Sequence, residues 1–250
     1  MTYSLFVGAG QWQAAASETA TQGFFGLDGD AQWQPLSNGL PDQVEVRSIV
    51  LHPDCSDTIY AGTQRGPYRS KDAGESWHSL TLPEGTPDED RVVWSICLDP
   101  SDPETIYVGT QNTAVFRSRN GGQGFERLVI PEPEGVVCAS FAMRVIRIAV
   151  AADDPNHILV AFEIGGLVRS RDGGNNWESC NSDLLSLSRQ GHLRSAIISD
   201  QDTEGMMDSH ALIFDPGDQD TVWLANRMGL FRSKDGGEHW SEFGIGQFSP

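Results

Sequence analysis

The sequence predicts an all-β fold of the β-propeller type, built from four-stranded antiparallel blades. Three observations carry this prediction. Turn-forming residues are abundant, with 27 Gly and 13 Pro in 250 residues, and long stretches lack helical periodicity. A short motif recurs along the chain. The same order of strand patterns precedes the motif each time, so one structural unit is repeated.

The motif is eight residues long and rich in Ser, Asp, Gly and Trp. It reads SKDAGESW at 70–77, SRNGGQGF at 118–125, SRDGGNNW at 170–177 and SKDGGEHW at 233–240, with a degenerate copy, GLDGDAQW, at 26–33. The Asp side chain accepts backbone N–H bonds across a tight turn, and the Gly supplies the positive φ that such a turn requires. The Trp buries a large apolar face beside it. We therefore expect structural roles for the turn residues and burial for the tryptophans: Asp28, Asp72, Asn120, Asp172 and Asp235, and Trp77, Trp177 and Trp240.

Two apolar strands separated by a short polar turn precede each full motif. They read TIYAGTQRGPYRS, TIYVGTQNTAVFRS, HILVAFEIGGLVRS and TVWLANRMGLFRS. A further apolar strand ending in a Pro turn lies upstream, and a short strand follows the motif, which makes four strands per repeat. We place five blades in a single domain spanning 1–250: roughly 1–41, 42–83, 90–131, 143–183 and 208–245.

The first blade starts at a pattern that matches the second strand of the other blades. Since sheet edges must be paired or covered, we expect the chain to be part of a larger ring of six to eight blades. A five-bladed ring with one three-stranded blade is the alternative. The motif-to-motif spacings, counted from Asp28 to Asp235, are 44, 48, 52 and 63 residues, and the growth lies in the connections between blades.

The motif resembles the Asp-box, or BNR, repeat, whose pattern is SxDxGxTW. Proteins with this repeat include sialidases, xyloglucan-cleaving glycosidases, sortilin-like receptors and photosystem II assembly factors. The resemblance implies a propeller but leaves the activity open, because one fold hosts many functions. A sialidase would also bring an Arg-Ile-Pro signature, which the sequence lacks, and a nucleophilic Tyr. All four tyrosines are expected in strands instead: Tyr3, Tyr60, Tyr68 and Tyr107.

The charge balance narrows the class of partner. Lys and Arg total 17 against 35 Asp and Glu, so the net charge of −18 would repel nucleic acid and anionic membrane surfaces. The four cysteines show no metal-type or disulfide-type spacing, and neither a secretory signal nor a membrane span is visible. We expect a cytoplasmic protein with reduced thiols, no cofactor, and a small polar or anionic ligand, a glycan or a protein as partner.

Ligands of propellers usually bind at the mouth of the central channel, so we looked for chemistry at the start of each innermost strand. Aligning these strands on their Pro turns brings Arg47, Trp94, Arg147 and His210 to corresponding positions. Arginines, an indole and an imidazole around one opening would suit an anionic or polar ligand. The turns between the second and third strands add Arg65, Asn112, Glu163 and Arg227. Ordinary solvent-exposed residues would give the same pattern.

The connection at 181–209 is long enough to be a lid or a binding element. It contains His192 and Arg194, followed by the carboxylates Asp200, Asp202, Glu204 and Asp208, and a second histidine, His210, comes directly after the connection. Such a set is a weak candidate for a divalent cation site or an acid and base pair. The spacing matches no known metal motif, and a solvated acidic loop is the alternative.

These observations leave three classes of function. The first is a scaffold that binds a ligand or a protein at its mouth, since no catalytic set of residues is identifiable. The alternative is a glycoside hydrolase or another hydrolase or lyase, whose carboxylates would have one raised and one ordinary pKa. The third is a structural element of a larger assembly. Whether the protein is an enzyme is left open by the sequence.

Overall fold

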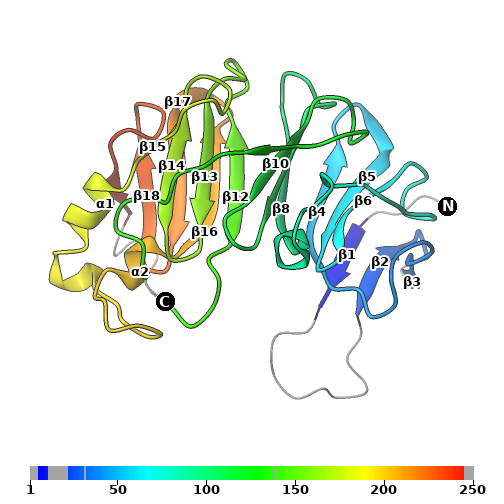
Figure 1. The fold of residues 1–250 in the computed structure, drawn as a ribbon, viewed down its shortest axis with the longest axis horizontal. Helices are drawn as coiled ribbons and strands as arrows, with labels where there is room; N and C mark the ends of the chain where they lie inside the picture. Colours follow the sequence, from blue (N-terminus) through cyan, green and yellow to red (C-terminus); the bar gives the residue numbers. More distant parts are fainter. Residues whose placement is uncertain (1–4, 11–21, 31, 138, 245–250) are drawn as a thin grey trace.

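The structure is a computed structural model, and it describes residues 5–10, 22–30, 32–137 and 139–244. Its strands form five antiparallel sheets, which follow one another from the three-stranded sheet at the right of Figure 1 to the sheet of β16–β19 at the left. The first strands of successive sheets lie next to one another, and the sheets fan outward from them. This is the arrangement of blades in a β-propeller, as the sequence predicts.

Each blade keeps its strands in chain order. Blade 1 has three strands, β1 (Leu5–Ala9), β2 (Gly23–Leu27) and β3 (Trp33–Pro35). Blades 2 to 5 have four strands each: β4 (Val46–His52), β5 (Cys55–Thr63), β6 (Gly66–Ser70) and β7 (His78–Ser79); β8 (Val93–Leu98), β9 (Ile106–Thr110), β10 (Val115–Ser118) and β11 (Glu126–Leu128); β12 (Val145–Val150), β13 (Ile158–Phe162), β14 (Gly166–Ser170) and β15 (Glu178–Ser179); β16 (Ser209–Asp215), β17 (Asp218–Asn226), β18 (Gly229–Ser233) and β19 (Ser241–Phe243).

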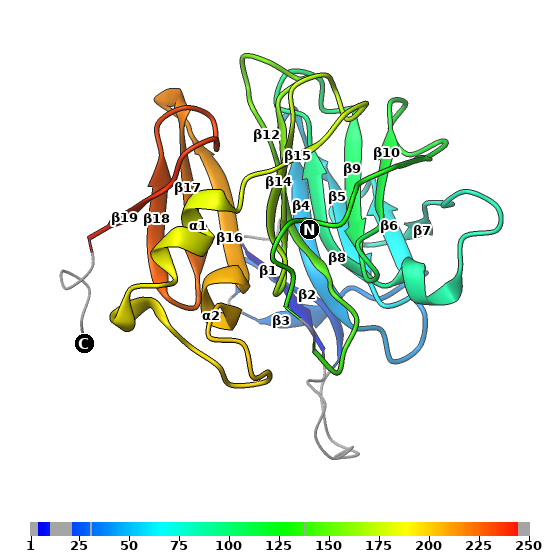
Figure 2. The ribbon, with the colours of Figure 1, turned by 60° about the vertical axis from the view of Figure 1, so that its left-hand side comes forward.

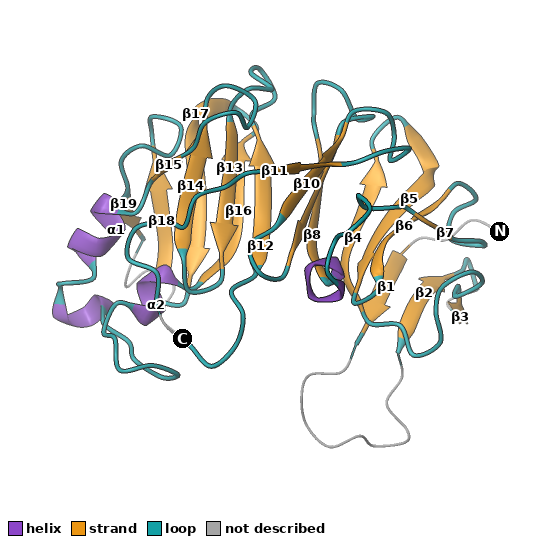
Figure 3. Cartoon of the chain, in the orientation of Figure 1, coloured by secondary structure: helices purple, strands orange, loops and turns teal. Residues whose placement is uncertain are grey.

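Helices are short throughout the described part of the chain, as Figure 3 shows. They are η1 (Asp88–Arg91), α1 (Ser182–Leu187), η2 (Gly191–Leu193) and α2 (Glu204–Met207). The last three belong to the 181–209 insertion, which lies beside blade 5 (Figure 2). Among the described residues, no helix has both the length and the apolar character needed to cross a membrane.

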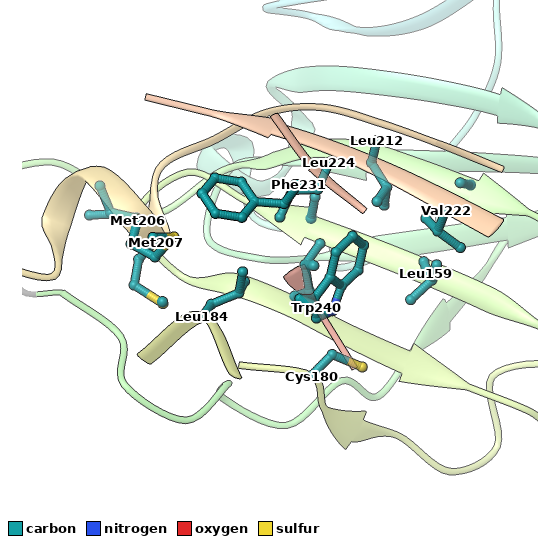
Figure 4. Packing of buried hydrophobic residues seen from close by; sticks show 14 of the residues in the cluster. Leu159, Cys180, Leu184, Met206, Met207, Leu212, Val222, Leu224, Phe231 and Trp240 are labelled. Atoms are coloured by element: carbon teal, nitrogen blue, oxygen red, sulfur yellow. The ribbon is translucent and has the colours of Figure 1, made fainter. Parts of the chain in front are cut away.

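An apolar core lies between each pair of neighbouring blades. The core between blades 4 and 5 also takes in the insertion, through the fully buried side chains of Leu184, Met206 and Met207 (Figure 4). Full burial of such a side chain stabilises by roughly 1.5–3 kcal/mol. The insertion is therefore a packed part of the fold, and it holds the residues around it in fixed positions.

Glycines on β1, β5 and β9 allow neighbouring blades to approach closely. A Cβ at each of these glycines would come within 2.6 Å of a valine on the first strand of the next blade. The pairs are Gly8 and Val46, Gly62 and Val93, and Gly109 and Val145. Any larger residue would force the first strands apart, and these strands carry the mouth of the propeller.

The repeated motif forms the turn between the last two strands of each blade. In blade 2 the Asp72 carboxylate accepts the Ser76 N–H at 2.8 Å, and Ser70 Oγ accepts the Gly74 N–H at 2.8 Å. Equivalent bonds form at Asn120, Asp172 and Asp235, and the Asp28 carboxylate accepts two backbone N–H groups of its own turn. These turns lie at the strand ends away from the mouth.

Candidate functional site

A β-bulge lies at the start of the first strand in each four-stranded blade. The pairing of this strand with its neighbour shifts by one residue there. The residues inside the bulges are Arg47, Trp94, Ile146 and His210. Bulges re-aim side chains and recur beside functional sites. We call this end of the blades the mouth: it comprises the bulges, the residues leading into them, and the turns after β5, β9, β13 and β17.

Three of the four sequence candidates for the mouth occupy bulges, whereas Arg147 does not. Ile146 takes the equivalent position in blade 4, and Arg147 pairs with Ala161 one step further along β12. Its side chain is exposed, and its Nη1 donates to the Ile146 carbonyl at 2.8 Å.

The sequence alignment of blade 4 is therefore one residue out of register with the structure. Blade 3 has two prolines in its first hairpin, Pro100 and Pro103, and blade 4 has Pro155. Pro103 lies nine residues after Trp94, and Pro155 lies nine residues after Ile146, so these two prolines are the equivalent pair.

Trp94 is the centre of a stack that spans three blades. The guanidinium carbon of Arg47 lies 4.3 Å from the centroid of the indole, and that of Arg144 lies 4.2 Å from it. β8 lies between β4 and β12, so the two arginines come from the blades on either side of the one that carries Trp94. Arg144 also lies 4.9 Å from the ring centroid of Phe141. Such cation–π contacts contribute about 0.5–2 kcal/mol each and fix the planes of the guanidinium groups.

Each arginine of the stack is paired with a carboxylate. Arg47 Nη2 lies 2.5 Å from Glu45 Oε2, and Arg144 Nη1 lies 2.9 Å from Glu163 Oε2. Burial raises the pKa of Glu163, and the charge of Asp208 raises it further against the opposing effect of Arg144. A carboxyl group with a raised pKa is a group that can hold a proton nearer to neutral pH.

Two N–H donors of the stack have no hydrogen-bond partner in the described part of the chain. Arg47 Nη1 and Trp94 Nε1 are buried, and neither has a hydrogen-bond partner among the described residues. Buried donors are normally satisfied by protein, water or ligand, so these two point to a polar molecule at the mouth.

A second charged group completes the mouth on the side of blade 5. Arg227, in the turn after β17, binds the buried carboxylates of Glu204 and Asp208, the latter at 2.5 Å. His210 Nε2 lies 3.6 Å from Asp208 Oδ2, and the imidazole is exposed. The structure thus brings Asp208, His210 and Arg227 together.

Glu204 holds the backbone of the insertion in place through hydrogen bonds. Its Oε2 accepts the backbone N–H groups of Ile197, Ile198 and Ser199, at 2.7–3.0 Å, and the Ser199 hydroxyl. Burial would raise the pKa of Glu204, but these bonds and the bond from Arg227 lower it to about 2. A carboxylate held this way organises the loop.

The other candidates from the insertion do not gather around an ion. Asp200 and Asp202 are exposed, with Arg194 3.6 Å from Asp202, and His192 pairs with Glu242 on the outer strand β19 at 2.9 Å. In the described parts of the chain, no group of three or more His, Cys, Asp or Glu is arranged to hold a metal ion. His192 therefore lies at the outer edge of blade 5 rather than at the mouth.

The remaining turn residues differ in their surroundings. Arg65 is exposed, with its backbone N–H bonded to Thr63 Oγ1 at 3.0 Å. Asn112 adopts a positive φ of 56° and donates to Asp90 Oδ1 at 2.9 Å, which is a local turn contact. The sequence analysis missed Glu45, Phe141 and Arg144. Matching Pro155 to Pro103 would have placed Arg144 next to the bulge of blade 4 and revealed it.

The chain is similar in sequence to part of several proteins named xyloglucanases. The chain is 27% identical over 205 residues to a probable oligoxyloglucan-reducing end-specific xyloglucanase of Neosartorya fischeri, and 24% identical over 206 residues to an oligoxyloglucan-reducing end-specific xyloglucanase of Emericella nidulans. Each match covers 78% of this chain and 23% of the relative. A xyloglucanase of a Paenibacillus species is 32% identical over 149 residues, which cover 55% of this chain and 14% of that protein. The chain spans less than a quarter of the length of these relatives, and no protein-family profile matches it.

Solved structures support the fold. A GH74 xyloglucanase from Xanthomonas campestris superposes with a TM-score of 0.63 at 22% identity, covering 88% of this chain and 32% of the enzyme. The extracellular domain of a two-component system from B. thetaiotaomicron superposes with a TM-score of 0.61 at 14% identity, covering 86% and 25%. At these identities the similarity establishes a β-propeller and leaves the ligand to be argued from the mouth.

Proposed function

We propose that this chain is a glycan-binding propeller of glycoside hydrolase type, with the mouth as its binding surface. The observation that carries the proposal is the pair of buried donors without partners, Arg47 Nη1 and Trp94 Nε1, in a chain whose curated relatives are named xyloglucanases. We also propose that the repeated turns place this chain in the Asp-box group of propellers.

The chemistry of the mouth fits a neutral polar ligand. Two arginines already lie over the Trp94 ring, which leaves less of the indole for a sugar ring to stack on. Hydrogen bonds then carry much of the recognition, and the fixed guanidinium planes of Arg47 and Arg144 suit pairs of hydroxyl oxygens. The carboxylates of Glu45 and Glu163 offset the positive charge of the arginines, so an anion gains little net attraction.

Calorimetric titration with xyloglucan oligosaccharides tests this proposal. Arg47→Ala and Arg144→Ala each remove charged donors, and we expect each to weaken binding by about tenfold or more. Arg147→Ala is the matched control, since this exposed arginine on the same strand as Ile146 lies outside the stack. Equal affinity in all three variants, or no binding of any xyloglucan or cello-oligosaccharide to the native chain, would exclude the mouth as a glycan site.

Hydrolysis at the same mouth is the second candidate, favoured by the raised pKa of Glu163 beside Asp208. A carboxyl group that keeps its proton can protonate a glycosidic oxygen. Glu163→Gln should then abolish release of reducing ends while oligosaccharide affinity stays within about threefold of the native value. If Glu163→Gln leaves turnover intact, this residue is not the proton donor.

A further inference from the structure

Each blade has a forward face, which packs on the next blade, and a backward face, which packs on the previous one. In blades 2 to 4 four positions lie on the forward face, one on or beside each strand, and all of their residues except Pro67 contribute to the core with the next blade. Pairing across the sheets identifies them as Val50, Tyr60, Pro67 and Leu80; Cys97, Tyr107, Val115 and Leu128; and Ala149, Leu159, Leu167 and Cys180.

Blade 5 carries large apolar residues at the same four positions. The same pairing scheme assigns them as Ile213, Trp223, Leu230 and Phe243. Ile213 is 58% exposed and the other three are half-buried. The equivalents of Trp223 on the second strands of blades 2 to 4 are Tyr60, Tyr107 and Leu159, and each is at most 2% exposed. The forward face of blade 5 thus has the composition of an interface between blades without the burial of one.

An arginine on the third strand repeats in the same way. Arg69 donates to the Gly121 carbonyl in the motif turn of blade 3, and Arg117 donates to the Gly173 carbonyl in that of blade 4. The equivalent Arg169 reaches Glu238 in the turn of blade 5 at 3.3 Å. Each arginine therefore bridges its blade to the motif turn of the next one.

Arg232 is the equivalent arginine of blade 5. It lies over the rings of Trp223 and Phe243, at 5.7 Å and 4.8 Å from their centroids. Its Nε is buried and has no hydrogen-bond partner in the described part of the chain. The guanidinium group is stacked on the forward face in a position from which its equivalents bind the next blade.

The backward face of blade 1 shows the complementary pattern. Leu5 and Trp33 are 51% and 48% exposed, whereas their equivalents in blade 2, Ile59 and Trp77, are at most 3% exposed. Each end of the blade array thus presents one unburied half of the interface that recurs four times inside it.

We propose that the forward face of blade 5 is the docking surface for a further blade of this same repeat. The continuity with the four established interfaces selects this occupant: a blade supplies both the apolar backward face that Ile213, Trp223 and Phe243 need and a motif-turn carbonyl of the kind that the Nη1 atoms of Arg69 and Arg117 bind. An unrelated globular partner is not expected to present an apolar face and a turn carbonyl at the spacing of the repeat.

The test extends the full chain at its C-terminal end by a second copy of residues 81–131, the connection and blade that follow blade 2. We expect amide exchange in β17 and β18 to slow by about tenfold or more in the extended chain, because their forward face becomes buried. Trp223→Lys or Arg232→Ala in the extended chain should reverse this protection. Leu51→Lys is the matched control, since Leu51 is 51% exposed and lies outside the forward face.

The other outcomes overturn the proposal. An added blade that stays unprotected, or that folds while β17 and β18 exchange as before, shows that this face does not receive a blade. Docking that appears only after Trp223→Tyr and Phe243→Leu, which copy blade 2 more closely, shows that the native face fits something else. Concentration-dependent dimerisation of the native chain that Trp223→Lys abolishes makes a second copy the occupant instead.

Discussion

Arg144 and Trp94 lie in different blades, yet the guanidinium carbon of one is 4.2 Å from the ring centroid of the other. Arg47 stacks on the same indole from a third blade. The single ring of Trp94 therefore ties blades 2, 3 and 4 together at the mouth. It also fixes two arginines that would otherwise be flexible side chains, and preorganised donors lose less entropy when a ligand binds.

Replacing Trp94 with Leu should release both arginines. We expect the free energy of unfolding to fall by about 1–3 kcal/mol, from the loss of two cation–π contacts, and oligosaccharide affinity to fall with it. Urea denaturation and calorimetric titration measure the two effects. Trp33→Leu is the control, because Trp33 is 48% exposed on blade 1 and contacts neither arginine. Unchanged affinity in Trp94→Leu would show that the stack does not prepare the mouth for a ligand.

Glu204→Gln should loosen the insertion. The carboxylate accepts bonds from three backbone amides, a hydroxyl and Arg227, and we expect its replacement to cost about 2–3 kcal/mol at pH 7. The pKa of Glu204 is lowered from 4.5 to about 2 in the fold. Its contribution is therefore complete above about pH 4.5 and is lost as the pH falls towards 2.

The difference in stability between native protein and Glu204→Gln should accordingly shrink between pH 5 and pH 2, measured by urea denaturation at several pH values. Asp202→Asn is the matched control, since Asp202 is an exposed carboxylate of the same insertion. A constant difference across that interval would mean that the charge of Glu204 plays no part.

The fold was predictable because its information is local and repeated. The motif turns, the strand patterns and the short strands of blade 1 can all be read from neighbouring residues, so five copies reinforce one another. The candidate site was harder, because Arg144 meets Trp94 only through the packing of two blades. A shift of one residue in aligning blade 4 was enough to select Arg147 instead of Ile146 and to hide Arg144.

The insertion illustrates the same limit. Its carboxylates form one cluster in the sequence, but in the fold only Glu204 and Asp208 meet, at Arg227. Glu204 turns inward to backbone amides, Asp208 pairs with Arg227, and Asp200 stays exposed. The direction in which each side chain points depends on α2 and on the buried Met206 and Met207, which a residue-by-residue inspection of charge does not predict.

The motif tryptophans should differ in their contribution to stability. Trp240 is 5% exposed in the core between blades 4 and 5, and Trp240→Ala should cost about 3–5 kcal/mol. Trp177 is only half-buried, contrary to the burial expected from the sequence, so Trp177→Ala should cost clearly less. Urea denaturation of both variants measures the difference. Equal losses would show that exposure of the indole edge does not matter for its packing.

The turn of blade 5 should give the protein a pH-dependent contribution that does not involve the mouth. His239 Nδ1 lies 2.7 Å from Asp235 Oδ2, and this hydrogen bond, aided by the charge of Asp235, raises the pKa of His239 above its ordinary 6.5. A raised histidine pKa stabilises the fold below pH 6.5, and the stabilisation is lost as the pH rises through the folded value.

His239→Ala should therefore lower the unfolding temperature at pH 5.5 and have little effect at pH 8.5, while oligosaccharide affinity stays unchanged at both. His78→Ala is the control, because His78 is an exposed histidine with no carboxylate partner among the described residues. Equal shifts of the unfolding temperature at the two pH values would exclude the ion pair as their cause. A loss of oligosaccharide affinity in His239→Ala would contradict the placement of the ligand at the mouth, because this turn lies at the opposite ends of the strands.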